Sequence, residues 1–117
     1  MSLVNKIIFL PNEFKRRKDI TFYSLLKETD YFKFYNEISE DSIVEEFNKH
    51  PGCINDWLSF SEDKRSSSGW YLIKDNSGNY IVGYYPPIDD YHKTEYKDRV
   101  KACAAFIKRE IEEIRKL

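Results

Sequence analysis

The sequence predicts an α+β fold with N-terminal helices, a small antiparallel sheet built around a hairpin at residues 69–85, and a C-terminal helix packed on that sheet. Three observations predict it. Apolar residues recur at helical spacing in the first half of the chain, two aromatic segments flank a glycine turn, and a long apolar stripe ends the sequence. We expect one domain over 1–117, because 117 residues are too few for a second hydrophobic core.

The N-terminal helices come first. Residues 20–37 carry apolar side chains at loosely helical intervals. A clearer helix follows, for which Ser39 or Ser42 can serve as the N-cap, and Ser42 with Glu45 matches the spacing of a capping box. The His-Pro-Gly sequence after it is typical of a helix end. We expect Trp57 to enter the core from a short helix or turn beyond this point.

The hairpin has the best-defined local pattern. A three-residue turn is expected at 76–78, with Gly78 in the left-handed conformation, and this turn pairs Asp75 with Asn79. One face then carries Trp70, Leu72, Tyr80, Val82 and Tyr84, and the other carries Tyr71, Ile73, Ile81, Gly83 and Tyr85. Both faces are apolar, whereas a hairpin with one solvated face alternates apolar with polar residues. A third strand is also expected, at Lys6–Leu10, because an isolated hairpin is only marginally stable.

The C-terminal helix supplies a cover for one of these faces. Its apolar stripe recurs at intervals of three and four residues and consists of Tyr96, Val100, Cys103, Ile107, Ile111 and Ile114. Thr94 is the expected cap of this helix. Two covers stay open for the second face of the hairpin. One is the N-terminal helices with Trp57, and the other is a partner that contacts an exposed edge around Tyr84, Tyr85 and Tyr91.

The overall charge argues against some partners. Nineteen basic residues against twenty acidic ones give a net charge of −1, whereas domains that bind nucleic acid or anionic membranes are basic. We interpret the one basic cluster, Lys15-Arg16-Arg17-Lys18, as a solvated helix end or loop. No apolar stretch has the length of a membrane span or of the core of a secretion signal. We therefore expect a soluble, cytoplasmic protein with neither nucleic acid nor membrane as its partner.

The cysteines and histidines do not form a recognisable catalytic or metal-binding pattern. Cys53 and Cys103 are expected to be reduced and to pack as small hydrophobic residues. His50 lies three residues before Cys53, but no nucleophile motif surrounds the pair. No close pair of ligands of the Cys-x-x-Cys kind indicates zinc. The sequence therefore predicts no catalytic residues, no metal and no cofactor.

Charge is unevenly distributed along the chain. Between Glu28 and Glu46, seven acidic residues stand against one basic residue, Lys33, which is a local balance of −6. This segment is either an ordinary solvated helix surface or a docking surface for a basic protein. On a docking surface, acidic residues speed association and aromatic anchors slow dissociation. The candidate partner-binding residues are Glu37, Asp41, Glu45, Glu46, Tyr84, Tyr85 and Tyr91.

Four short segments carry a resemblance to a known class of proteins. They are Asp63-Lys64-Arg65, Ser68-Gly69-Trp70-Tyr71, YIVGYY at residues 80–85 and ACAAFIK at residues 102–108. Over about residues 62–113, the chain resembles small bacterial immunity proteins, which are encoded beside polymorphic or contact-dependent growth inhibition toxins. The resemblance implies a non-enzymatic protein that binds and neutralises one cognate toxin domain, often a nuclease. The acidic segment agrees with this independently, because nucleases carry basic sites for phosphates.

Two other functions stay open at this point. The same surface can serve an adaptor or regulatory domain that has another partner. A small enzyme or ligand-binding protein is the third interpretation, and it would use the Asp63–Ser68 loop together with His92. We expect this loop to lead into the hairpin rather than to bind phosphate, because neither a glycine pattern nor a helix start follows it.

Overall fold

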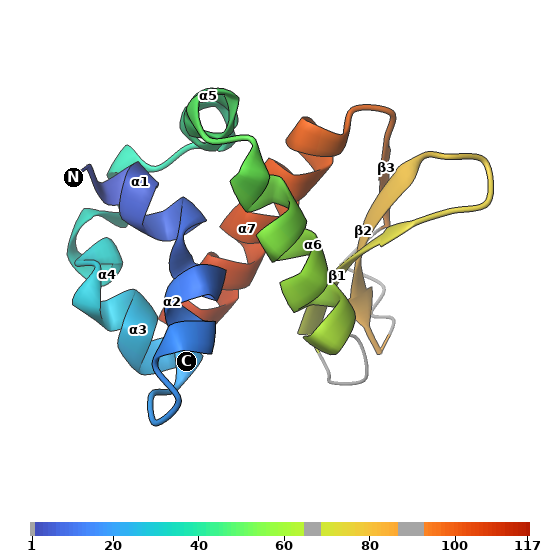
Figure 1. Ribbon diagram of the computed structural model, residues 1–117. Coiled ribbons are helices and arrows are strands. Elements are labelled where there is room, and N and C mark those ends of the chain that lie inside the picture. Colours follow the sequence, from blue (N-terminus) through green and yellow to red (C-terminus); the bar gives the residue numbers. More distant parts are fainter. Residues whose placement is uncertain (1, 65–68, 87–92) are drawn as a thin grey trace.

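The computed structural model describes residues 2–64, 69–86 and 93–117, and the side chains of residues 63 and 64 lie outside that description. It confirms the α+β class, with helices at the N-terminus and a C-terminal helix that packs on a three-stranded antiparallel sheet (Figure 1). The helices are α1 (Leu3–Ile8), α2 (Leu10–Arg16), α3 (Phe22–Glu28), α4 (Tyr31–Phe34), the 3-10 helix η1 (Tyr35–Glu37), α5 (Glu40–Lys49), α6 (Gly52–Lys64) and α7 (Arg99–Arg115). The strands are β1 (Gly69–Lys74), β2 (Tyr80–Tyr85) and β3 (Thr94–Tyr96).

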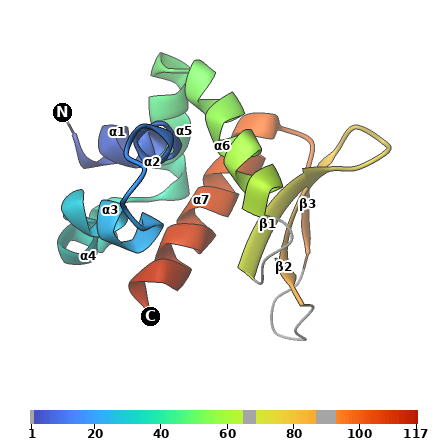
Figure 2. The same cartoon turned by 60° about the horizontal axis from the view of Figure 1, so that its bottom comes forward.

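Helix α7 lies between the N-terminal helices and the sheet, as Figures 1 and 2 show from two directions. It contacts α3, α5 and α6 as well as all three strands. Because neighbours surround it, every residue of Ala102–Ile107 is buried. The C-terminal helix therefore covers one face of the sheet, as the sequence predicts. Helices α1 to α5 pack on α7 and on other helices, whereas α6 also packs along β1, where Leu58 lines a pocket with Ile73 of the second face. Among the helices that we considered as a cover for the second face, α6 is therefore the one with extensive contacts to the described strands.

The hairpin forms with the predicted register. The backbone N–H of Asp75 donates to the carbonyl of Asn79 at 2.8 Å, and Gly78 has a φ of 92°. The left-handed conformation that this turn needs is one that glycine adopts without steric cost. Tyr85 of the second face is 53% exposed. Gly83 on that face leaves room for the Tyr71 ring, since a Cβ at position 83 would lie 2.6 Å from Cζ of Tyr71.

The predicted position of the third strand is wrong. The sheet has the order β1-β2-β3, and the third strand is Thr94–Tyr96, which pairs with β2. Lys6–Leu10 spans the junction of two helices instead. Its helical state has local causes: the Ser2 side chain caps α1 by accepting from the N–H of Asn5 at 3.2 Å, and a proline within the first turn of α2 suits a helix start.

One predicted helix cap, Thr94, is wrong, and so is one predicted capping-box pairing. Thr94 belongs to β3, and the N-cap of α7 is Asp98, whose carboxylate accepts from the N–H of Val100 at 2.8 Å. Tyr96 is therefore a strand residue and not the first member of the helical stripe. At the start of α5, Ser39 is the N-cap, one of the two serines that the sequence offered. Its capping box pairs Ser39 with Ser42: the Ser39 N–H donates to Ser42 Oγ at 3.0 Å, and the Ser42 N–H donates to Ser39 Oγ at 3.1 Å. The predicted capping box had paired Ser42 with Glu45 instead.

Trp57 enters the core as predicted, although α6 is a full helix rather than a short turn. The indole is fully buried, and its Nε1–H donates to the carbonyl of Ile8 at 3.0 Å. Its ring also lies against Phe22, Phe60 and Phe106 in edge-on geometry. This side chain therefore joins α1, α3, α6 and α7 in one place, and it satisfies a carbonyl at the end of α1 that has no partner within that helix.

Candidate partner-binding surface

The acidic surface lies on η1 and the outer side of α5. Helical periodicity explains the orientation: Ile43 and Phe47 are fully buried, so Asp41 and Glu45 point outward one turn apart. Glu37 precedes them on η1 and is exposed as well. The exposed carboxylates of this surface form no ion pair with a described residue, and they are Glu37, Glu40, Asp41 and Glu45.

Glu46 does not belong to this exposed set, although the sequence predicted it as a partner contact. The residue is only 8% exposed, and its Oε2 accepts from Nδ2 of Asn5 at 2.9 Å. Lys49 Nζ lies 3.8 Å and His50 Nε2 lies 3.7 Å from its carboxylate oxygens. Glu46 therefore joins α1 to α5 within the protein. Its inward direction follows from its place on the helix face that also carries the buried Phe47.

The exposed charge of the segment 28–46 is smaller than its sequence count. Glu46 is buried, and Glu28 forms an ion pair with Arg17 at 2.9 Å. Without these two residues, the segment has five carboxylates and one cation, Lys33, which gives a local net charge of −4. The excess of negative charge persists after the internal contacts are subtracted.

The hairpin tyrosines do not join the acidic surface. Tyr84 lies on the face of the sheet that α7 covers, where its hydroxyl donates to Glu113 Oε1 at 2.9 Å and its ring contacts Trp70 at 5.3 Å between centroids. Tyr85 projects from the opposite face. Tyr91 lies outside the described residues. Since α7 separates the sheet from α5 (Figure 2), the fold does not bring Tyr84 and Tyr85 together with the acidic residues of α5.

Phe34 is an exposed aromatic residue that lies beside the acidic surface. Its side chain is 44% exposed, and it borders a shallow groove of ≈ 270 Å³ between α1 and the η1–α5 segment. The residues that line this groove are Ser2, Leu3, Val4, Phe34, Glu37, Ile38 and Ser42. Sequence reasoning missed Phe34, although one signal was present: it is an aromatic residue outside the helical spacing that Phe32 and Tyr35 follow.

A polar network holds the segment that carries Phe34 against α7. The Tyr31 hydroxyl donates to Glu112 Oε2 at 2.6 Å, and Arg115 Nε donates to the same oxygen at 2.7 Å. Lys108 Nζ donates to the Tyr35 carbonyl at 3.2 Å, and the Arg115 guanidinium lies 3.7 Å from the Tyr35 ring centroid. Burial raises the pKa of Tyr31 and lowers the pKa of Lys108. These contacts position α4 and η1 and so fix one wall of the groove.

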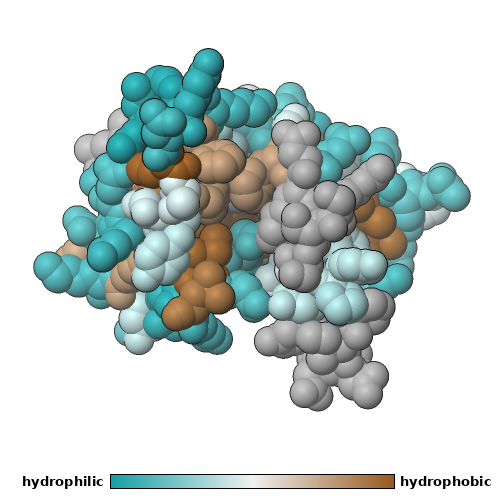
Figure 3. All heavy atoms as spheres, turned by 90° about the horizontal axis from the view of Figure 1, so that it is seen from below, coloured by the Kyte–Doolittle hydropathy of each residue, from teal (hydrophilic) through white to brown (hydrophobic). Residues whose placement is uncertain are grey.

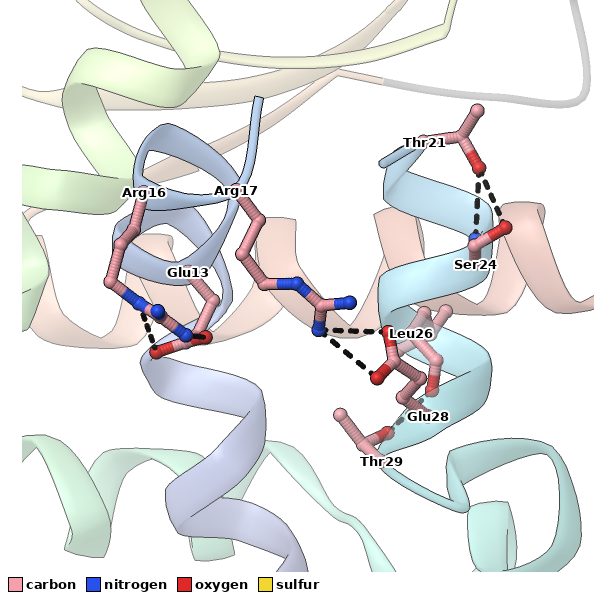
Figure 4. Close-up of polar contacts among 8 residues, drawn as sticks. All are labelled: Glu13, Arg16, Arg17, Thr21, Ser24, Leu26, Glu28 and Thr29. Carbon is pink, nitrogen blue, oxygen red and sulfur yellow. Dashed lines mark hydrogen bonds and ion pairs between the residues drawn. The ribbon is translucent and has the colours of Figure 1, made fainter. Parts of the chain in front are cut away.

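A second hollow lies between α2 and α3. Figure 4 shows the Arg17 side chain extending from the end of α2 to Glu28 at the end of α3, where Nη1 and Oε2 are 2.9 Å apart. The pocket has a volume of ≈ 330 Å³ and is lined by Lys6, Phe9, Leu10, Glu13, Arg17, Leu25, Glu28 and Thr29. Two basic and two acidic side chains balance one another around it. Its charges therefore indicate no particular class of ligand.

Two of the four cations in the basic cluster at the end of α2 form ion pairs within the protein. Arg16 pairs with Glu13, and Arg17 pairs with Glu28, as Figure 4 shows. All of these side chains lie at the surface. The structure therefore agrees with the interpretation of this cluster as a solvated helix end.

Apolar side chains also gather on the lower face of the molecule, in the hollow between hydrophilic areas shown in Figure 3. On the helical side, Phe22 stacks on Phe60 at 4.6 Å between centroids, and Phe14 meets Phe22 edge-on at 5.6 Å. Phe14 is 37% exposed. The neighbouring Arg16 and Arg17 are paired internally, so neither guanidinium identifies a partner for this cluster.

The environment of Cys53 does not favour a nucleophile. The thiol is buried, and burial followed by the nearby carboxylates of Asp56 and Glu46 raises its pKa, whereas a reactive cysteine needs a lowered pKa. His50 Nε2 lies 3.3 Å from Asn5 Nδ2 and 3.7 Å from a carboxylate oxygen of Glu46. Among the described residues, no group of three or more His, Cys, Asp or Glu side chains is arranged to hold a metal ion. The residues 65–68 and His92, which the enzyme interpretation invoked, lie outside the described residues.

No helix in the described parts of the chain is both long and apolar enough to cross a membrane.

Comparison with other proteins assigns this chain to no family. No family model, no curated protein and no solved structure matches this chain.

Proposed function

We propose that this protein is a non-enzymatic binding protein that captures a basic protein through the acidic surface of η1 and α5. With the resemblance noted above, the partner is a toxin domain, such as a nuclease, and the protein acts as its immunity protein. The observation that carries the proposal is the set of exposed carboxylates that form no ion pair with a described residue, namely Glu37, Glu40, Asp41 and Glu45.

This arrangement works against the stability of the free protein. Asp41 and Glu45 are separated by one helical turn, and like charges at that spacing destabilise a helix by about 0.2–0.5 kcal/mol. The repulsion disappears when lysine or arginine side chains of a partner approach. Complementary charge of this kind raises association rates and orients the encounter, most strongly at low ionic strength. The active site of a nuclease offers such positive charge, because it is built to hold phosphates.

The second candidate is an adaptor or regulatory domain that uses the same surface on a different basic partner. The protein encoded immediately upstream of this chain separates the two functions. We expect that protein to inhibit growth when it is expressed alone, and coexpression of this chain to relieve the inhibition and yield a purified complex. An upstream protein that is neither toxic nor bound would favour the adaptor function.

The acidic surface itself is tested with two double variants of equal charge change. Asp41→Lys with Glu45→Lys reverses the proposed surface, and Asp19→Lys with Glu62→Lys reverses two exposed carboxylates elsewhere. We expect the first variant to associate with the partner at least about tenfold more slowly at low salt, with the difference shrinking as salt is added. The second variant should associate at nearly the wild-type rate. Equal rates for both variants would show that the acidic surface is only solvated.

A further inference from the structure

We propose that the groove between α1 and the η1–α5 segment receives an apolar side chain of the partner, and that lysine or arginine residues flank this side chain in the partner's sequence. This inference rests on the proposed function and adds the chemistry of the occupant. The groove is distinct from the outer carboxylates because its wall is apolar, with Leu3, Val4 and Phe34 among its lining residues. Among the described residues that line it, only Glu37 carries a charge.

Both hydroxyl groups in the lining already take part in hydrogen bonds within the protein. Ser2 Oγ accepts from the N–H of Asn5, which caps α1. Ser42 Oγ accepts from the N–H of Ser39 at 3.0 Å and donates to the Ser39 carbonyl at 2.8 Å. The groove therefore offers an occupant apolar contact and few free hydrogen-bonding groups, which favours an aliphatic or aromatic side chain over a polar one.

The groove has walls that are fixed before a partner binds. Ile38 is only 5% exposed, and the Tyr35 carbonyl, which accepts from the Ile38 N–H at 3.3 Å, also accepts from Lys108. Ser2 fixes the start of α1 on the other side. Preorganised walls reduce the ordering cost of binding. The volume of ≈ 270 Å³ is at the small end for a ligand pocket and suits a side chain rather than a whole small molecule.

The charges around the groove select a basic flanking sequence. Glu37 lines it, and the exposed carboxylates of Asp41 and Glu45 continue from it along α5. The one cation of the segment, Lys33, has its Nζ 6.0 Å from the Phe34 ring centroid. An acidic segment would meet repulsion from the carboxylates, and a neutral segment would gain nothing from them. A partner segment with lysine or arginine next to an apolar residue can place the apolar side chain in the groove and its cations beside the carboxylates.

The test uses defined peptides and the isotope-labelled full-length protein in NMR titrations. The probes are a peptide of lysine, glycine and leucine, a second peptide in which serine replaces leucine, and a third in which glutamate replaces lysine. We expect the lysine–leucine peptide to bind about tenfold more tightly than the lysine–serine peptide, because the loss of one well-buried apolar anchor typically weakens affinity by about this factor. We expect its shift changes to centre on residues 2–4 and 34–38. The glutamate–leucine peptide should bind least.

A matched pair of variants locates the anchor. Phe34→Ala should remove the advantage of leucine over serine, while Tyr23→Ala, which truncates an aromatic residue of 43% exposure against the 44% of Phe34, should preserve it. Unfolding curves verify that both variants are folded. The comparison of the peptides on the wild-type protein does not depend on either variant.

The outcomes separate the groove from the proposed function. If both lysine peptides bind equally at the acidic surface, the groove inference is overturned while the electrostatic proposal survives. If the glutamate–leucine peptide binds as tightly as the lysine–leucine peptide, the choice of a basic flanking sequence is wrong. If no peptide binds, or if shift changes fall on the sheet or around Phe14, both the groove and the acidic surface are rejected as the docking site.

Discussion

The Ser61 side chain closes the outer edge of the sheet by bonding both backbone groups of Leu72. Its Oγ accepts from the Leu72 N–H at 2.8 Å and donates to the Leu72 carbonyl at 3.0 Å. Strand β1 is an edge strand, and an unpaired edge is a site at which another chain can add. Helix α6 thus protects the edge with a hydroxyl that takes the place of a neighbouring strand.

Replacing Ser61 by alanine should destabilise the fold by about 1–3 kcal/mol, because a buried N–H and a buried carbonyl would lose their shared partner. Urea unfolding measures the change. Ser59→Ala is the matched control, since Ser59 is exposed on the same helix and should change stability by less than about 0.5 kcal/mol. A Ser61→Ala protein as stable as the control would show that water replaces the hydroxyl at this edge.

Replacing Ile107 by aspartate should cost more than about 3 kcal/mol, because Ile107 is fully buried in the helix between the sheet and the N-terminal helices. The measurement is the melting temperature or the unfolding free energy. Lys101→Asp places the same side chain on an exposed position of α7 and should be tolerated. An unchanged melting temperature for Ile107→Asp would mean that α7 is not the centre of the core.

The Glu112 carboxylate should make stability depend on pH in the acid range. Burial alone would raise its pKa, but hydrogen bonds from Arg115 and Tyr31 outweigh burial and hold the pKa below its usual range. A depressed pKa stabilises the folded state above the unfolded value of about 4.3, and the contribution is lost as pH falls through the lower folded value. We expect Glu112→Gln to reduce the unfolding free energy by about 1 kcal/mol near neutral pH.

The difference between wild type and Glu112→Gln should shrink as the pH is lowered below about 4, and urea unfolding at a series of pH values measures it. Glu45→Gln provides the comparison, since Glu45 is exposed and has no ion pair with a described residue. A difference that stays constant across the acid range would assign the loss to packing rather than to the ionised carboxylate.

Both thiols should be unreactive in the folded protein. Cys53 and Cys103 are free and buried, and burial raises the pKa of each, so little of the nucleophilic thiolate is present. Ellman's reagent at neutral pH should detect neither thiol until denaturant is added, after which it should detect both. Chelator and reductant should leave the melting curve in place. A fall of many degrees with chelator would reveal a metal that the sequence did not indicate.

Elements with a local cause were predictable from the sequence. The turn at Gly78, the register from Asp75 to Asn79 and the helix that contains Ile107 all follow from a left-handed glycine or from apolar spacing. The acidic character of the segment 28–46 is likewise a property of the chain itself. These features depend on residues within a few positions of one another, so contacts between distant parts of the chain are not needed to specify them.

The order of the layers and the membership of the surface depended on contacts between distant parts of the chain. Periodicity shows that α7 has an apolar stripe, but it cannot show that helices α1 to α5 pack on the side of α7 away from the sheet, or that α6 packs along β1. The short strand at Thr94–Tyr96 has too few residues for a pattern, and its pairing with β2 creates it. Glu46 is buried and accepts a hydrogen bond from Asn5, while Phe34 is exposed next to Glu37. The burial of each side chain depends on what packs against it and not on its chemical type alone.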